Sequence, residues 1–404
     1  MRRSLLPLAP AVLALGCGGS IDPPPEAAEL VALTARQQSA PAGGAVNEPP
    51  AVRVVDATGR PVPEAEVSFV PSSGSIVEPA RGLTDADGVA RVIRWVVPAG
   101  PASLDASVPG APSIRFEAEG GPRAFDLVIR WLEPPPPEAV VAAAAAEALL
   151  ESIIWADLPD ESVVATEVCR VGGDPVATID ETIDDVLVLA RVGEMDGPGG
   201  AGAQGFPCLL RDPGTQTIVG FVRLDRGDFV LIDQDRRREF FLHELVHALG
   251  LVPGVISIST PSGFTRDCLQ QPSRGAPDPL VLDTHFSCAG ARHGFDQVGG
   301  VRYPGAKVPL ENGATVALTA NTLNHHWRKS SFGNELMTGW FTAGVRAPLS
   351  VVTVGALEDL GYGVSYAAAE AFVLDGPIST APVAAVPLVE RAAIAPPAIL
   401  GRSR

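Results

Sequence analysis

The stretch with the clearest chemical meaning is His243-Glu244-Leu245-Val246-His247. On an α-helix this spacing places two imidazoles one turn apart on one face, with a carboxylate beside them. A catalytic zinc site uses three protein ligands and leaves a fourth position for water. The pattern therefore predicts two zinc ligands, His243 and His247, and a general base, Glu244. The alternative is that both histidines are ordinary polar residues of an amphipathic helix, because a bare H-E-x-x-H also arises by chance.

The neighbouring residues favour a helix around this motif. Asp233 or Asp235 can cap its start, and Gly250 can end it in a left-handed turn. The face away from the histidines is predicted to be apolar, through Phe241, Leu242, Leu245, Val246 and Leu249.

A third ligand must come from another segment. The position three residues after Gly250 is Pro253, which cannot bind a metal ion. The other histidines of the chain all follow this point: they are His285, His293, His325 and His326. The residue types alone leave these four candidates open.

Three further motifs follow in a fixed order: Asn324-His325-His326-Trp327, Asn334-Glu335-Leu336-Met337-Thr338-Gly339 and Ala356-Leu357-Glu358-Asp359-Leu360-Gly361-Tyr362. This order resembles the leishmanolysin-like branch of the metzincin zinc peptidases. In that branch a long insertion separates the H-E-x-x-H helix from a third histidine that precedes tryptophan, and a methionine turn follows. The Met195-to-Gly200 and Val308-to-Gly313 stretches resemble further signatures of bacterial members.

The resemblance implies an α+β, metzincin-like zinc peptidase domain over residues 124–375. It makes His243, His247 and His326 the ligands of one catalytic Zn²⁺ and Met337 the hydrophobic floor beneath the metal. Glu244 becomes the general base that acts with a zinc-bound water. The expected activity is that of a metalloendopeptidase acting on protein or peptide substrates. His325 has no counterpart role.

The N-terminus reads as an export signal. Residues 1–16 combine basic Arg2 and Arg3 with an apolar run from Leu5 to Leu15, as in a secretory leader. The Leu13-to-Cys17 ending resembles a bacterial lipoprotein box, so Cys17 is expected to carry a lipid that anchors the protein at the outer membrane or cell surface. The alternative is an ordinary cleaved signal with a stray cysteine and a secreted protein.

Four cysteines remain after Cys17, and an even number in an exported protein predicts disulfides. Three pairings are possible. Sequence neighbourhood favours Cys169 with Cys208 and Cys268 with Cys288. A thiolate zinc site is the alternative, but no C-x-x-C spacing supports it.

The rest of the chain divides by composition. Residues 17–28 resemble a linker, and residues 29–120 show short alternating strands and turn signals such as Asp85-Ala86-Asp87-Gly88, which predict an all-β sandwich. This part resembles bacterial Ig-like domains of intimin and invasin type, modules that usually serve as spacers or adhesion units. A strand from Phe125 to Leu132 and an Ala-rich helix from Glu138 to Trp155 are expected next, and residues 376–404 form an Ala- and Pro-rich tail.

Length and charge set outer limits on function. The 404 residues suffice for two or three domains, and 46% hydrophobic residues argue against wholesale disorder. A formal net charge of −17 disfavours electrostatic capture of nucleic acid. Two other functions compete with the peptidase: a surface adhesion protein with a vestigial peptidase domain, and a zinc hydrolase of non-peptide bonds.

Overall fold

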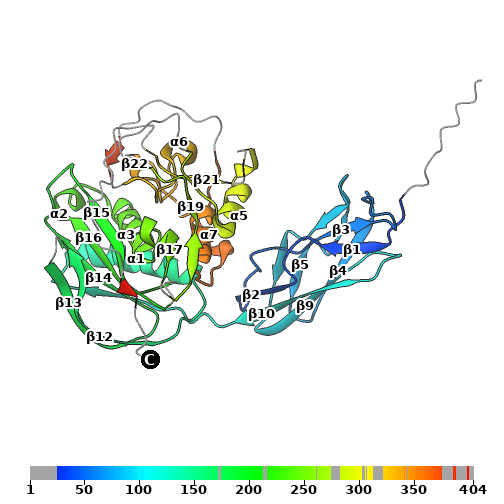
Figure 1. Ribbon diagram of the computed structural model, residues 1–404, viewed down its shortest axis with the longest axis horizontal. Coiled ribbons are helices and arrows are strands. Elements are labelled where there is room, and N and C mark those ends of the chain that lie inside the picture. The colour runs from blue at the N-terminus through cyan, green and yellow to red at the C-terminus, as the bar shows by residue number, and fades with distance from the viewer. Residues whose placement is uncertain are drawn as a thin grey trace, which may run out of the picture.

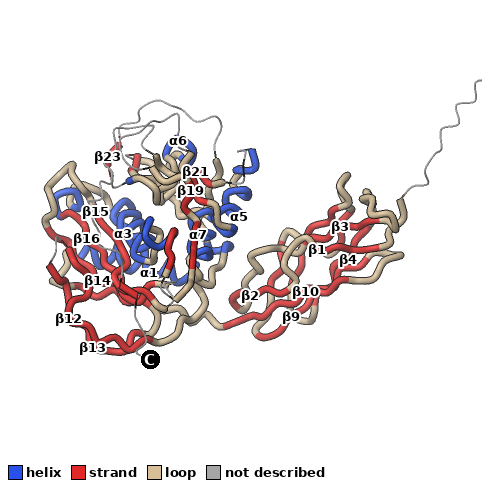
Figure 2. The backbone as a smooth tube through the Cα atoms, in the orientation of Figure 1, coloured by secondary structure: helices blue, strands red, loops and turns tan. Residues whose placement is uncertain are grey.

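The computed structural model describes residues 25–171, 174–212, 216–260, 262–273, 283–302, 305, 307–312, 322–342, 344–374, 385–387 and 398–399. The predicted leader and Cys17 lie outside these residues. Figure 1 shows two bodies: an elongated N-terminal β domain and a larger mixed α/β domain. Among the described residues, helices occur only in the second domain (Figure 2).

The N-terminal domain consists of strands that pack around one apolar core. They are β1 (Glu29–Ala32), β2 (Gln37–Pro41), β3 (Ala51–Val55), β4 (Glu66–Pro71), β5 (Ile76–Glu78), β6 (Arg81–Leu83), β7 (Val89–Arg91), β8 (Arg94–Val96), β9 (Gly100–Ser107) and β10 (Ile114–Gly121). One sheet has the order β1-β3-β7, a second has the order β2-β10-β9-β4-β6, and β5 pairs with β8 in a small third sheet. Side chains alternate between core and solvent along β10, as expected for a half-buried strand. Phe69, Trp95 and Phe116 fill the core.

The second domain is built on a sheet with the order β11-β14-β16-β15-β24. Its strands are β11 (Leu127–Trp131), β14 (Val186–Gly193), β16 (Thr217–Asp225), β15 (Ala203–Leu210) and β24 (Ala398–Ile399). The first three run parallel, whereas β15 is antiparallel to β16. Strand β24 comes from the predicted tail, so the tail contributes two residues to this sheet.

The two faces of this sheet are covered differently. Val186 and Val188 of β14 point toward helices α1 (Pro137–Ile153) and α3 (Gln234–Ala248). Leu187 and Leu189 point to the other face, where the hairpin of β12 (Glu161–Val171) and β13 (Asp174–Ile183) covers the sheet. The stretch Gln234–Ile256 is long and apolar enough to cross a membrane, but 89% of its apolar window is buried inside the protein.

A short helix, α2 (Arg226–Phe229), lies between β16 and α3 in the chain. The remaining elements follow α3. They are α4 (Pro253–Ile256), β17 (Ser257–Ser259), β18 (Thr265–Asp267), β19 (Leu269–Gln270), β20 (His285–Phe286), α5 (Ala289–Gln297), β21 (Val308–Pro309), α6 (Lys329–Phe332), β22 (Trp340–Thr342), α7 (Val351–Asp359) and β23 (Ala385–Pro387), with 3₁₀ turns at Gly300–Arg302 and Tyr366–Ala368.

Two disulfides tie distant segments together. Cys169 of β12 is bonded to Cys208 of β15, and Cys268 is bonded to Cys288 at the start of α5. These are the pairs that sequence neighbourhood favours. The first one joins the β12–β13 hairpin to β15, the strand that lies against α3.

Candidate metal centre

Helix α3 begins and ends where its sequence predicts. The Asp233 side chain accepts a hydrogen bond from the main-chain N–H of Arg236 at 2.9 Å, which caps the helix. Gly250 follows with a φ of +117°, a value that glycine tolerates. The helix is not simply amphipathic, because every residue from Glu239 to Ala248 is buried. The described residues 322–342 and 344–347, which follow the insertion, lie over the histidine face.

Three histidines meet at the centre of this buried region. The Nε2 atoms of His243 and His247 lie 3.0 Å apart, and each lies 3.1 Å from Nε2 of His326. All three side chains are fully buried. His326 is therefore the one of the four open candidates that the structure brings to the H-E-x-x-H helix.

The second nitrogen of each ring faces a main-chain carbonyl. Nδ1 of His243 lies 2.8 Å from Leu336 O, and Nδ1 of His247 lies 2.7 Å from Leu251 O. Nδ1 of His326 lies 2.9 Å from Thr322 O. A carbonyl only accepts, so each Nδ1 carries the proton and donates it. In a neutral imidazole this leaves a bare lone pair on Nε2.

Three lone pairs that converge without a proton between them fit a cation. Burial lowers the pKa of His243 to about 3 and also holds the pKa values of His247 and His326 well below the usual value, so all three rings stay neutral. A tetrahedral ion bonded at about 2.0 to 2.1 Å keeps its ligand nitrogens about 3.3 Å apart, close to the separations in this cluster. The donor set thus fits zinc.

His326 is held by the chain on both sides. Its carbonyl accepts from the N–H of Glu311 at 2.8 Å, and the N–H of the next residue, Trp327, donates to Met337 O at 2.8 Å. The Trp327 indole donates to Thr353 Oγ1 at 2.8 Å. The fully buried Trp327 therefore anchors the third histidine to the turn that contains Met337.

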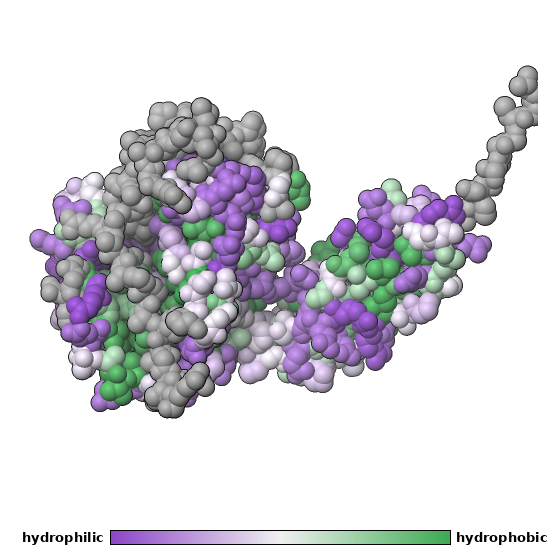
Figure 3. Space-filling model, in the orientation of Figure 1, coloured by the Kyte–Doolittle hydropathy of each residue, from purple (hydrophilic) through white to green (hydrophobic). Residues whose placement is uncertain are grey.

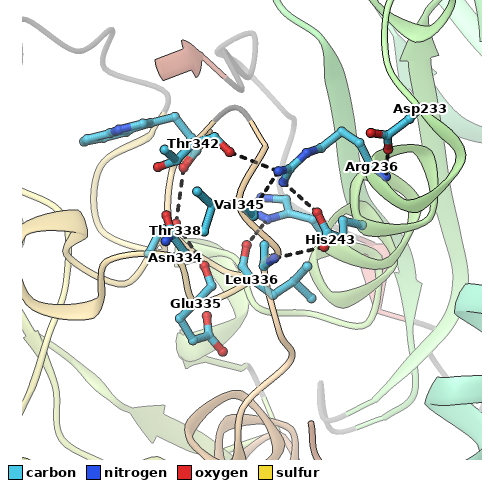
Figure 4. A network of polar contacts seen from close by, with 12 residues as sticks. Asp233, Arg236, His243, Asn334, Glu335, Leu336, Thr338, Thr342 and Val345 are labelled. Atoms are coloured by element: carbon cyan, nitrogen blue, oxygen red, sulfur yellow. Dashed lines mark hydrogen bonds and ion pairs between the residues drawn. The ribbon is translucent and has the colours of Figure 1, made fainter. Parts of the chain in front are cut away.

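The Met337 turn is organised by a buried carboxylate. Glu335 accepts hydrogen bonds from Met337 N at 2.6 Å, from both the N–H and the hydroxyl of Ser350 at 3.1 and 2.8 Å, and from Thr353 Oγ1 at 2.6 Å. Burial raises the pKa of Glu335 to about 7, while these four donors act in the opposite direction. Figure 4 shows Glu335 and Leu336 on the turn that faces His243.

Glu244 is fully buried on the same helix, and its main chain lies against β15. A Cβ atom at Gly205 of β15 would come within 2.1 Å of Glu244 O, so only glycine allows the strand this close. Among the described residues, one other group of possible ligands occurs, Asp157, Asp184 and Asp185, of which the first two are exposed. Exposed acidic residues often cluster without binding a metal.

The other histidines do not join the cluster. The His325 ring is buried, and its centroid lies 4.3 Å from that of the His326 ring at an interplanar angle of 44°. Its Nδ1 lies 2.7 Å from Leu323 O, and it is not part of the ligand group. His285 lies on β20 with Nδ1 2.6 Å from Asp283 O. Nε2 of His293, on α5, lies 2.7 Å from Nε2 of Gln297.

Two features of the site have no counterpart in the sequence predictions. Asp225 accepts hydrogen bonds from the main-chain N–H groups of Met195, Asp196 and Gly197, which fixes the Gly-rich stretch before β15. Arg236 and Glu239 form a buried ion pair one to two turns before His243. The sequence gave no reason to expect buried roles for these charged residues, because exposed charges are common near helix ends.

Comparison with known proteins identifies the N-terminal domain. Residues 30–116 match the family of bacterial Ig-like domains (group 1). The D0-D1 domain of intimin is 25% identical over 22% of this chain and 45% of that chain, with a TM-score of 0.17. The D00-D0 domain of intimin is 23% identical over the same shares, also with a TM-score of 0.17.

A beta-glucuronidase from Parabacteroides merdae is 13% identical over 24% of this chain and 12% of that chain, with a TM-score of 0.18. The match thus spans less than half the length of each of these three structures. No curated protein matches the chain. The N-terminal domain is an Ig-like β domain similar to the intimin modules, and the leishmanolysin-like nature of the second domain stays a prediction.

Proposed function

We propose that the protein is a zinc-dependent metalloendopeptidase whose second domain has a metzincin-like fold. The observation that carries this proposal is the convergence of the Nε2 atoms of His243, His247 and His326 within 3.1 Å, with every Nδ1 bonded to a main-chain carbonyl. Metal-ligating histidines typically donate their second ring N–H in this way.

In peptide hydrolysis, the bound zinc and Glu244 would have separate roles. Zinc in this site would polarise the scissile carbonyl and acidify its water. Glu244 follows His243 on α3 and is not part of the ligand group, so its carboxylate can take a proton from the attacking water and later pass it to the leaving nitrogen. Burial of the site excludes bulk water from these transfers.

The arrangement of β15 supports a peptide substrate. On its outer side, the described part of the chain pairs β15 only with β24, at Leu209 and Leu210. Residues 203–208 lie beside the H-E-x-x-H helix, since Gly205 contacts Glu244. An extended peptide can add to such an edge through main-chain hydrogen bonds.

A role in adhesion or spacing is proposed for the N-terminal domain. Its similarity to intimin modules supports this, and it exposes Val70, Ile76, Leu83 and Ile93. Apolar side chains gather on the face of this domain that Figure 3 shows. Together with the predicted leader and lipidated Cys17, the domain would hold the peptidase at the cell surface.

Metal analysis and peptide turnover test the enzyme proposal together. The purified protein is expected to contain about one zinc per chain and to cleave casein. A chelator should abolish cleavage, and added zinc should restore it. Zinc binding without any cleavage of casein or a peptide library would instead favour the adhesion protein with a vestigial peptidase domain. No zinc binding would contradict the proposal itself.

A further inference from the structure

The segment that follows the Met337 turn lies against the first metal ligand. We call the described residues 340–342 and 344–347 the wall segment. Within it, the Phe341 ring meets the His243 ring edge-on, with centroids 5.8 Å apart. Phe341 also lines a cavity of about 600 Å³ between this segment and the first half of α3. The wall segment therefore borders the histidine cluster on one side and a cavity on the other.

Arg236 binds two main-chain carbonyls of this segment, and Lys329 binds a third, that of Trp340. The Arg236 guanidinium donates to the carbonyl oxygens of Thr342 at 3.0 Å and Val345 at 2.5 Å. It also lies over the Phe341 ring, 4.6 Å from its centroid. Figure 4 shows Arg236 reaching from α3 to both carbonyls, beside His243.

Glu239 completes the attachment from the next turn of α3. Its Oε2 lies 2.6 Å from Nη1 of Arg236, and its Oε1 accepts from the N–H of Ala347 at 2.9 Å. The two side chains are only 12% and 3% exposed. A buried ion pair is weak evidence for stability, because apolar residues of similar volume often serve as well. What apolar residues cannot replace is the set of three hydrogen bonds to the wall segment.

We propose that Arg236 and Glu239 are positioning residues: their ion pair fixes the wall segment beside His243 and thereby sets how tightly a peptide substrate is held. This inference rests on the proposed peptidase function. Neither residue belongs to the group of metal ligands, so replacing the pair should leave the three ligand nitrogens in place.

The test replaces both charges at once, because a single replacement leaves one buried charge without its partner. In the double variant Arg236→Met/Glu239→Leu, zinc content should equal that of the wild type. Hydrogen exchange of the main-chain amides in the wall segment should become about tenfold faster. With an internally quenched peptide, KM should rise about fivefold while kcat stays within about twofold.

Two further variants complete the design. Arg237→Gln changes the neighbouring arginine, which donates to Phe229 O and not to the wall segment, and should leave exchange and KM unchanged. If the double variant does not fold, Arg236→Lys keeps a positive charge beside Glu239 but lacks the guanidinium that reaches both carbonyls, and it should show the same changes to a smaller degree.

The outcomes separate this inference from the peptidase proposal. Wild-type exchange and KM in a folded double variant would overturn the positioning role, as would loss of zinc. If the wild type cleaves no peptide, the peptidase proposal fails and the substrate claim fails with it, and the exchange rates alone decide whether the pair fixes the wall segment.

Discussion

The main-chain N–H of Trp327 donates to the carbonyl oxygen of Met337 at 2.8 Å. The preceding carbonyl, that of Leu336, accepts from Nδ1 of His243. Two consecutive carbonyls of one turn therefore hold the residue after the third histidine and the ring of the first. This turn therefore holds helix α3 next to the segment around His326, although the two are far apart in sequence.

The turn itself should depend on Glu335. In Glu335→Gln, one acceptor oxygen becomes an NH₂ group that faces the donors of Met337, Ser350 or Thr353. The free energy of unfolding should fall by about 1 to 3 kcal/mol, because a buried donor loses its acceptor. Urea unfolding measures this change. The exposed Glu138→Gln serves as the control and should lie within about 0.5 kcal/mol of the wild type. If Glu335→Gln is as stable as the control Glu138→Gln, Glu335 does not organise the turn.

Glu244 should matter for turnover and not for metal binding. Glu244→Ala is expected to retain about one zinc per chain and to lose nearly all peptidase activity, because the carboxylate is not a metal ligand. Elemental analysis and peptide turnover on the same preparation check both halves. A metal-free Glu244→Ala protein would show that this residue has been given the wrong role.

The adjacent histidines should behave differently. His326→Ala removes one of three converging Nε2 atoms and should lose both tight zinc binding and activity. His325→Ala should keep its zinc, with a loss of about 10- to 100-fold at most, the range for residues that only support ligands. Matched metal analysis and turnover decide between them. The reverse pattern would shift the ligand by one residue, and mild effects from both would exclude His326.

Removal of the metal should expose a pH dependence from the buried rings. Burial lowers the pKa of His243 to about 3, whereas the unfolded chain takes up this proton near pH 6.5. Between these values the unfolded state binds more protons, so stability falls as the pH falls. In excess chelator, the unfolding free energy of the wild type should drop more steeply than that of His243→Leu, by about 1.4 kcal/mol per pH unit. Parallel curves for the two proteins would show that the ring is not neutral when folded.

Local features of the site could be predicted from sequence because they depend on neighbours in the chain. The Asp233 cap, the Gly250 turn and the spacing of His243 and His247 all fall within one helix. The alternating pattern of residues 29–120 likewise predicted the Ig-like β domain, which the family match supports.

Features that join distant segments could not be derived in this way. Residue types left four histidines open as the third ligand, and only the family resemblance selected His326. Arg236 binds main-chain carbonyls, which any residue supplies, and Glu335 binds the hydroxyls of Ser350 and Thr353, which are distant in sequence from the metal helix. The β12–β13 hairpin was also missed, because its outward residues, such as Val164 at 78% exposed, break the polar-apolar alternation expected of a strand.

The separation of the ligands along the chain has a consequence for chain entropy. His247 and His326 are 79 residues apart, and Cys268 and Cys288 lie between them. An ion shared by the two histidines would act as a reversible cross-link that closes this loop. By the polymer relation for loop closure, such a link is worth about 4 kcal/mol, comparable to a disulfide of the same span. The proposed zinc would thus stabilise the fold by closing the loop between these two histidines, in addition to any part it takes in catalysis.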